Sequence, residues 1–261
     1  MPDEAHNRRA WNRLSGPRCP WSIPADDDRI AAARRGEFEI TVAGPRAVPR
    51  EWLGEPSGQS VLCLGAGGGQ QAPVLAAAGY CVTLLDISDA QLALDREVCT
   101  RHALDVRIEQ GTMTDLSRFD SSSFDLIVNP VSNPYISDVR QAWREAARVL
   151  APGGRLIAGS INPLLYLFEE NEGEDGKGLT VVHRLPYVES ESLDEHDLAL
   201  AVQGEMVFTW SHSLEDIIQG QIDAGLIIAG LYESKRTDTR APSINRYAPT
   251  YIVTMAEKPG A

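Results

Sequence analysis

The chain is poor in positive charge, and in lysine above all. Its 261 residues include 24 lysines and arginines against 37 aspartates and glutamates, which gives a formal net charge of −13. The only lysines are Lys177, Lys235 and Lys258, and no basic tract stands out. Because nucleic-acid binding depends largely on Lys and Arg contacts to phosphates, we expect no nucleic-acid partner.

Long apolar runs are missing as well. No stretch approaches the roughly 18–20 residues that a membrane-spanning helix needs. Residues 1–6 are polar and lack the apolar core of a signal peptide. We therefore expect a cytoplasmic protein that does not span a membrane. The sequence does not indicate an oligomeric state.

Cysteine is scarce and shows no ligand spacing. Cys19, Cys63, Cys81 and Cys99 form no C-x-x-C pair, and no histidine lies at ligand spacing from any of them. This pattern predicts reduced thiols packed in the core of a cytosolic protein, and it predicts no metal site.

Three regions of the chain differ in composition and in hydrophobic periodicity. Residues 1–58 are rich in Arg, Pro, Gly and Trp with weak periodicity, which indicates an amino-terminal extension or lid. Residues 59–261 form the expected main domain. Its regular pattern is interrupted at about 162–212 by a predicted cap, which includes an acidic, Gly-rich stretch at 169–176 that we interpret as a solvated loop.

Short apolar runs alternate with helical patterns through most of the main domain. The expected strands are 61–64, 80–86, 106–109, 124–128, 155–159, 226–232 and 250–255, and the expected helices are 70–78, 89–102, 136–150 and 213–225. The last long helix before the cap is expected to stop at the Pro-Gly-Gly of 152–154. This order predicts an α/β fold with a parallel sheet and helices on both of its faces.

A glycine-rich loop follows the first expected strand. Residues 61–70 read Val-Leu-Cys-Leu-Gly-Ala-Gly-Gly-Gly-Gln, and glycine suits such a loop where a ligand must approach the backbone more closely than a Cβ allows. The next strand ends in Asp86, where a carboxylate can accept both hydroxyls of a ribose. Loop and acid together predict an adenosine-type ligand at the carboxyl edge of the sheet.

Spacing alone does not identify that ligand. Residues 67–72 satisfy the loose dinucleotide pattern G-x-G-x-x-G/A, so a nicotinamide cofactor stays open, as does a glycine turn without a ligand. A short-chain oxidoreductase would carry Tyr-x-x-x-Lys on a helix, but Tyr166 is followed four positions later by Glu170, and no such pair occurs elsewhere.

The order of the motifs resembles the class I S-adenosylmethionine-dependent methyltransferase family. The loop at 65–69 matches the family's G-x-G-x-G, and 111–116 stands where the family has its adenine-contacting segment. Residues 122–127 are similar to its fourth strand, and 143–156 to its helix, Pro-Gly-Gly turn and fifth strand. These matches cover about 59–160, and the final helix with two strands also ends as the family does.

The resemblance implies a Rossmann-like, seven-stranded and mostly parallel sheet with an antiparallel last strand, an amino-terminal lid and an inserted cap. It implies S-adenosylmethionine as cofactor. The likeness extends to a subgroup of small-molecule methyltransferases through Trp-x-Ile-Pro at 21–24 and Asn-Pro-Val-Ser-Asn at 129–133. Two positions depart from the common family pattern, because Cys63 and Thr112 stand where acids are usual.

The resemblance also assigns roles to individual residues. Residues expected to bind the methionine part of the cofactor are Gly65, Ala66, Gly67, Gly69 and Gln70. Asp86 is expected to bind the ribose and Ile87 the adenine, with Thr112 and Met113 at the adenine edge. Asn129 is expected to face either the amino acid moiety or the transferring methyl, and Trp11 and Trp21 to close over the cofactor.

The expected reaction is an in-line displacement at the methyl carbon, aligned in a dry pocket. A base is needed only for an acceptor that starts protonated, and His183 is the candidate, with Tyr187 and His212 in or beside the same inserted region. Asn129-Pro130 begins the Asn-Pro-Pro-Tyr of base-specific amino-methyltransferases, but Val131 breaks that pattern. We therefore expect methyl transfer to a small molecule. An NAD(P)-dependent oxidoreductase and a non-catalytic adenosyl-ligand-binding protein are the alternatives.

Overall fold

The computed structural model describes residues 3–16, 19–168, 179–236 and 243–260. The strands are β1 Ser60–Leu64, β2 Cys81–Asp86, β3 Val106–Gln110, β4 Phe124–Asn129, β5 Leu150–Ile161, β6 Ile227–Ser234 and β7 Tyr251–Glu257. The helices of two turns or more are α1 Glu4–Leu14, α2 Asp27–Arg34, α5 Asp89–His102, α6 Val139–Val149 and α8 Glu195–Gln203. The shorter ones are α3 Arg50–Leu53, α4 Ala72–Ala77, α7 Glu189–Ser192 and α9 Gly220–Asp223, which a π-helical turn, η4 Glu215–Gln219, precedes.

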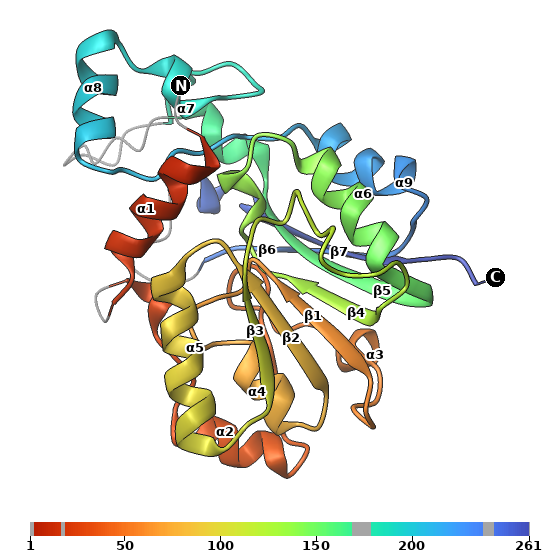
Figure 1. Cartoon of the computed structure of the whole chain (residues 1–261). Helices are drawn as coiled ribbons and strands as arrows, with labels where there is room; N and C mark the ends of the chain where they lie inside the picture. Colours follow the sequence, from red (N-terminus) through yellow and green to blue (C-terminus); the bar gives the residue numbers. More distant parts are fainter. Residues whose placement is uncertain (1–2, 17–18, 169–178, 237–242, 261) are drawn as a thin grey trace.

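The seven strands form one sheet in the order β3-β2-β1-β4-β5-β7-β6 (Figure 1). Strands β1 to β5 pair in parallel, and β7 is antiparallel to both β5 and β6. This arrangement confirms the predicted Rossmann-like fold with its antiparallel last strand. The strand order reverses between β1 and β4, and in open α/β sheets ligands bind at the carboxyl ends of the strands beside such a reversal.

Two hydrophobic cores cover the two faces of the sheet. Val61 and Cys63 of β1 point into the core beneath α2, α4 and α5, whereas Leu62 and Leu64 point into the core beneath α6. All four are fully buried. Successive strand residues face opposite sides, so a strand covered on both faces is a continuous apolar run, as the sequence shows at 61–64.

Helix α6 ends earlier than its periodicity predicts. Leu150 already pairs with Phe124 of β4, and the next registered pair is Leu126 with Arg155. The Pro-Gly-Gly at 152–154 therefore lies in a bulge within β5 and does not itself end the helix. Pairing with a neighbouring strand decides this boundary, which residue preferences alone do not reveal.

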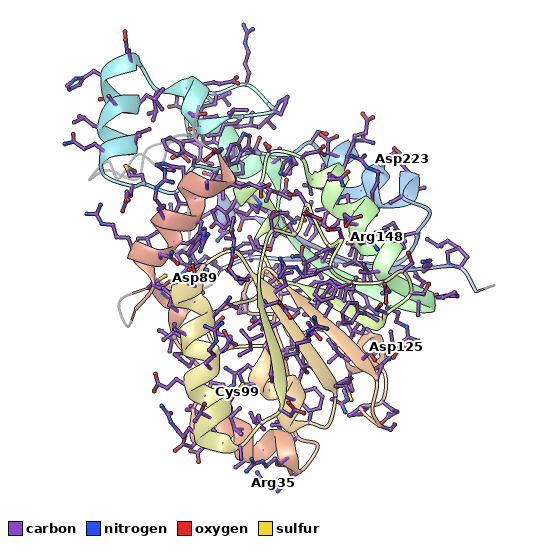
Figure 2. The ribbon with its side chains drawn as sticks, viewed as in Figure 1. Arg35, Asp89, Cys99, Asp125, Arg148 and Asp223 are labelled. Atoms are coloured by element: carbon purple, nitrogen blue, oxygen red, sulfur yellow. The ribbon has the colours of Figure 1, made fainter. Side chains whose placement is uncertain are left out.

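Helix α1 lies between α5 and the part of the inserted region that carries α7 and α8 (Figure 1). On the side toward α5, Arg8 forms an ion pair with Asp89, which lies at the start of α5 (Figure 2). Toward the inserted region, Asn7 donates to the carbonyl oxygen of Phe208 at 2.9 Å and accepts from the N–H of the same residue at 2.9 Å. The acidic stretch predicted as a loop at 169–176 lies outside the described residues.

Among the described residues, none of the helices is both long and apolar enough to cross a membrane. The cysteines differ in part from their predicted burial: Cys19, Cys63 and Cys99 are buried, but Cys81 is exposed. Cys81 begins β2 at the amino edge of the sheet, where its side chain meets solvent instead of a covering helix.

Candidate functional site

A cavity of about 370 Å³ lies at the carboxyl edge of the sheet, beside the reversal of strand order. Its volume falls within the roughly 300–1,000 Å³ of small-molecule sites. The segments that follow the first four parallel strands supply much of its wall: Gly65–Gly67 after β1, Asp86 and Ile87 at β2, Gly111–Met113 after β3, and Pro130–Ser132 after β4.

The N–H groups of the glycine loop are bonded within the chain. The Gly67 N–H donates to Asp86 Oδ2 at 2.9 Å. The N–H groups of Gly68 and Gly69 both donate to Asp95 Oδ2, at 2.8 and 3.0 Å. A loop that binds phosphate directs these N–H groups at the ligand. Here two carboxylates occupy them, which argues against a dinucleotide at this loop.

The glycines at 68 and 69 serve the chain's own amino-terminal segment. A Cβ at Gly68 would lie 2.5 Å from the Trp21 carbonyl oxygen, and a Cβ at Gly69 would lie 2.8 Å from Pro24 Cβ. Gly69 does not line the cavity. Gly69 was expected to bind the methionine part of the cofactor, but in the structure it packs against Pro24, and this half of the loop makes room for residues 21–24.

Gln70 strengthens the same attachment. Its Nε2 donates to the carbonyl oxygens of Pro20 and Ile23 at 3.2 and 3.1 Å. The Ala25 N–H donates to the Gly69 carbonyl oxygen at 2.7 Å. Gln70 lines the cavity as predicted, but its amide nitrogen holds the amino-terminal segment against the loop.

Asp86 ends β2 with its carboxylate at the cavity wall. Its Oδ2 accepts from Gly67 and its Oδ1 accepts from the Ser88 N–H at 2.8 Å. A carboxylate oxygen has two lone pairs, so each oxygen keeps one for a ribose hydroxyl. Burial raises the pKa of Asp86, and the hydrogen bonds from Ser88, Gly67 and Ile87 oppose that rise.

Asp95 is a site residue that the sequence reasoning missed. It lies on α5, is 0% exposed, and supports the loop from behind the cavity wall. Burial is the main cause that raises its pKa to about 7, and the charge of Asp86 adds to the rise. An acid on the helix face shared by Leu92 and Val98 is the signal that could have revealed it, because unpaired acids avoid apolar faces.

The part of the cavity that is predicted to bind adenine lies beside α1. Ile87, Thr112 and Met113 line the cavity. Thr112 Oγ1 is 2.8 Å from Thr114 Oγ1, which in turn donates to the Glu4 carboxylate at 3.0 Å. The threonine that replaces the family's usual acid thus belongs to a hydrogen-bonded chain that ends on the amino-terminal helix.

Aromatic residues of the extension also reach the cavity. Trp11 and Trp21 both line it, and Trp11 packs edge-on against Tyr135 with ring centroids 4.9 Å apart. Asn7 lines it as well, and its Nδ2 donates to the Tyr135 carbonyl oxygen at 3.0 Å. Asn7 is missing from the sequence predictions because only tertiary packing places it there.

The structure does not bring Asn129 into contact with the cavity. Asn129 is fully buried, and its Nδ2 donates to the Leu64 carbonyl oxygen at 2.7 Å and to Ser132 Oγ at 2.8 Å. Its amide therefore ties the end of β4 to the end of β1. Its amide nitrogen thus holds the wall of the cavity together from behind, whereas its buried Oδ1 has no hydrogen-bond partner among the described residues.

The candidate general base also lies outside the cavity. His183 does not line the cavity, and its ring lies 4.7 Å from that of Tyr187. His212 Nε2 lies 2.9 Å from the Asn133 carbonyl oxygen, and burial lowers its pKa. Among the described residues that line the cavity there is no histidine, and the only charged side chains are those of Asp86 and Arg236. His183 as general base is thus not supported by its position.

The remaining wall comes from the other half of the sheet. Ile161 ends β5, Tyr251 begins β7 and Arg236 follows β6, and all three line the cavity with Tyr135 and Gly44. Because strands lie about 4.8 Å apart, the four steps from β1 to β6 place Arg236 roughly 19 Å from the glycine loop's strand. The cavity therefore has a second half away from Asp86.

This fold and site define the class as an α/β protein with a small-molecule cavity at the strand reversal. The family described as "Methyltransferase domain" matches residues 62–158. The chain is 40% identical over 254 residues to the uncharacterized methyltransferase YbaJ of Bacillus subtilis, covering 97% of this chain and 98% of that protein. The chain belongs to the class I S-adenosylmethionine-dependent methyltransferase family.

More distant relatives share part of the chain or only its fold. A ubiquinone biosynthesis O-methyltransferase of Alkalilimnicola ehrlichii is 34% identical over 122 residues, covering 44% of this chain and 48% of that protein. A putative S-adenosylmethionine-dependent methyltransferase structure from Listeria monocytogenes aligns with a TM-score of 0.64 at 17% identity, covering 80% and 94% of the two chains. The [4+2]-cyclase SpnF aligns with a TM-score of 0.61 at 15% identity, covering 100% and 98%. The two structures show the fold alone.

The protein is thus a methyltransferase with S-adenosylmethionine as cofactor, as the motifs predicted. The residues present suit that cofactor. Asp86 lines the cavity and accepts one hydrogen bond from the chain at each oxygen, and the N–H groups of Gly67, Gly68 and Gly69 are bonded to carboxylates instead of being offered to a phosphate. The oxidoreductase and the non-catalytic binder are not favoured.

Proposed function

We propose that the methyl acceptor is a small molecule that binds in the half of the cavity lined by Tyr135, Ile161, Arg236 and Tyr251. The observation that carries this proposal is the continuity of one cavity of about 370 Å³ from Asp86 to Arg236. A net charge of −13 makes a nucleic acid an unfavourable acceptor. Four free cysteines suit a reducing compartment, so we propose that the enzyme acts in the cytoplasm.

We propose that the donor binds in the other half. Asp86 accepts the ribose hydroxyls, Gly65, Ala66 and Gly67 lie along the methionine part, and Ile87, Thr112 and Met113 surround the adenine. When bound, S-adenosylmethionine supplies a methyl group on a positively charged sulfur. Trp11 and Trp21 of the amino-terminal extension line this half, and we propose that they exclude water from it, with residues 1–58 as the lid and about 162–212 as an inserted cap.

The chemistry of the wall limits the acceptor. Burial raises the pKa of the Tyr135 hydroxyl, so this group stays protonated at neutral pH and does not act as a base. The described lining holds no histidine or lysine. We infer that the acceptor's nucleophile needs no proton removed by these side chains, as holds for a thiolate, a neutral amine, a carboxylate or a phenolate.

Arg236 suggests that the acceptor is an anion. It is the one cationic side chain among the described residues of the cavity wall, in a chain with an excess of acids. A guanidinium binds carboxylate or phosphate oxygens in a fixed fork geometry. We propose an acceptor with an apolar or aromatic body between Tyr135 and Ile161 and an anionic group toward Arg236.

Methyl transfer from radiolabelled S-adenosylmethionine tests this proposal. The acceptor panel holds small thiols, amines, phenols and carboxylic acids, with transfer RNA and duplex DNA as macromolecular comparisons. We expect labelling of an anionic small molecule, and a higher KM for it in Arg236→Gln with unchanged affinity for S-adenosylhomocysteine. Arg35→Gln, at the far end of α2 (Figure 2), is the matched control. Labelling of the nucleic acids alone would refute a small-molecule acceptor.

A further inference from the structure

Two acids, of which Asp95 is fully buried and Asp86 partly exposed, support three successive glycines of the loop. Asp86 accepts from Gly67, and Asp95 accepts from Gly68 and Gly69. Asp86 lines the cavity and has a ligand role in the proposed function. Asp95 does not line it and has no part in the reaction described above. A fully buried acid requires a reason of its own, because burying an ionised carboxylate is costly unless partners compensate.

The surroundings of Asp95 leave one oxygen without a partner. Asp95 Oδ1 is buried and has no hydrogen-bond partner in the part of the chain that the structure describes, and the same holds for Gln91 Oε1 one turn earlier on α5. Gln91 Nε2 donates to Ser22 Oγ at 2.9 Å, so the pair lies between the loop and the amino-terminal segment. The titratable groups that face Asp95 are the thiols of Cys63 and Cys99 and the carboxyl of Asp86.

We propose that Asp95 is a positioning and specificity-determining residue whose buried carboxylate fixes the rear of the glycine loop and makes the donor half select a cationic adenosyl ligand over anionic ones. The inference rests on the proposed assignment of this half of the cavity to the donor. It is independent of the nature of the acceptor.

The selection follows from charge and from bonding. The donor carries a positive sulfur that its demethylated product lacks, so a negative carboxylate behind the loop favours the donor. A phosphate is itself negative, so the same carboxylate repels it. The three loop N–H groups that would bind a phosphate are already bonded. Burial raises the pKa of Asp95 to about 7, and the preference for the donor should therefore grow as pH rises through neutrality.

Two substitutions separate positioning from charge. Asp95→Asn keeps an oxygen that accepts from Gly68 and Gly69 but never ionises. Asp95→Leu has a similar size and accepts no hydrogen bond, so both N–H groups lose their partner. Glu97→Gln is the matched control, because Glu97 is an exposed acid on the same helix that pairs with Arg101 at the surface.

The experiment is titration calorimetry with S-adenosylmethionine, S-adenosylhomocysteine and ADP, at about pH 6 and about pH 8. In the unchanged protein and in Glu97→Gln, we expect the ratio of donor to product affinity to rise several-fold between the two pH values, with ADP binding too weak to measure. Asp95→Asn should bind S-adenosylhomocysteine within about threefold of the unchanged protein and lose most of the pH-dependent rise. Asp95→Leu should bind it at least about tenfold more weakly.

Each of the following outcomes would contradict one part of the proposal. An Asp95→Asn variant with the full pH-dependent rise would overturn the role of the Asp95 charge. A folded Asp95→Leu variant with unchanged affinity would overturn the positioning role. Absence of S-adenosylhomocysteine binding in the unchanged protein would overturn the donor site, and this inference with it, while labelling of acceptors tests the acceptor half separately.

Discussion

The carbonyl oxygen of Trp21 lies where a side chain on Gly68 would begin, because a Cβ at position 68 would be 2.5 Å from it. The amino-terminal segment thus approaches the glycine loop as closely as a ligand would. This contact makes the extension part of the wall of the donor half, and it ties the stability of the loop to residues that lie far earlier in the chain.

The first prediction concerns Gly68→Ala. Gly68 has φ of +112° and meets backbone that cannot move aside, so we expect a loss of about 3–5 kcal/mol of unfolding free energy, from backbone conformation and overpacking together. Gly58→Ala is the control, since Gly58 has φ of +81° and nothing within 4 Å, and should lose about 1–2 kcal/mol. Urea unfolding measures both variants. Equal losses would show that the contact with Trp21 does not matter.

A second prediction concerns Asp86→Ala. Loss of the carboxylate removes the proposed ribose contact and leaves the N–H groups of Gly67 and Ser88 without their acceptor. We expect affinity for S-adenosylhomocysteine to fall about tenfold or more, as measured by calorimetry. Asp105→Ala, which removes an exposed acid, should leave affinity unchanged. An Asp86→Ala variant with normal affinity would remove Asp86 from the site.

The third prediction is a pH-dependent stability difference. Asp95 has a pKa of about 7 in the folded chain, raised from 3.8. Between about pH 4 and pH 7, the folded protein therefore keeps a proton on Asp95 that the unfolded chain has released. Over this range Asp95 lowers the unfolding free energy progressively as pH rises. Above about pH 7 the unfolding free energy falls no further on account of Asp95.

Asp95→Asn removes this titration. We expect the variant to gain stability over the unchanged protein as pH rises from about 4 to 7, up to the order of 4 kcal/mol, and the difference to level off above pH 7. Urea unfolding at a series of pH values measures it. A difference that is constant with pH would mean that Asp95 titrates normally.

The fourth prediction concerns the link between α1 and the inserted region. Asn7 is 1% exposed and makes three hydrogen bonds to the backbone of Tyr135 and Phe208. We expect Asn7→Ala to cost about 2–4 kcal/mol and to speed proteolysis of the segment around α8. Arg9→Ala, an exposed change on the same helix, serves as the control. Unchanged cleavage in Asn7→Ala would show that α1 does not hold that segment.

Local patterns predicted most of the fold. The helix expected at 89–102 is α5, and the strands expected at 61–64 and 124–128 are β1 and β4 with one more residue each. These elements have strong signals, since a strand buried on both faces is continuously apolar and α5 is preceded by the N-cap Ser88, whose hydroxyl accepts from the Gln91 N–H. The boundary between α6 and β5 was misplaced because strand pairing ends that helix.

Beyond Trp11 and Trp21 of the extension, the candidate site was predictable where it follows the strand ends. Asp86, Ile87 and Met113 lie at the cavity because parallel strands bring their carboxyl ends to one edge. Asn129 belongs to the same edge, yet its side chain turns into the wall, and this orientation depends on the Leu64 carbonyl oxygen that it meets. No sequence pattern specifies that partner.

The amino-acid order by itself determined the strand sequence, the glycine loop and the acid of β2, and with them the family and its cofactor, because these depend on neighbours along the chain. Tertiary structure alone decided that Asp95 accepts hydrogen bonds from two loop N–H groups, that Gly68 makes room for Trp21, and that His183 lies away from the cavity. Those contacts join residues distant in the chain, and their geometry is set only when the packed elements meet.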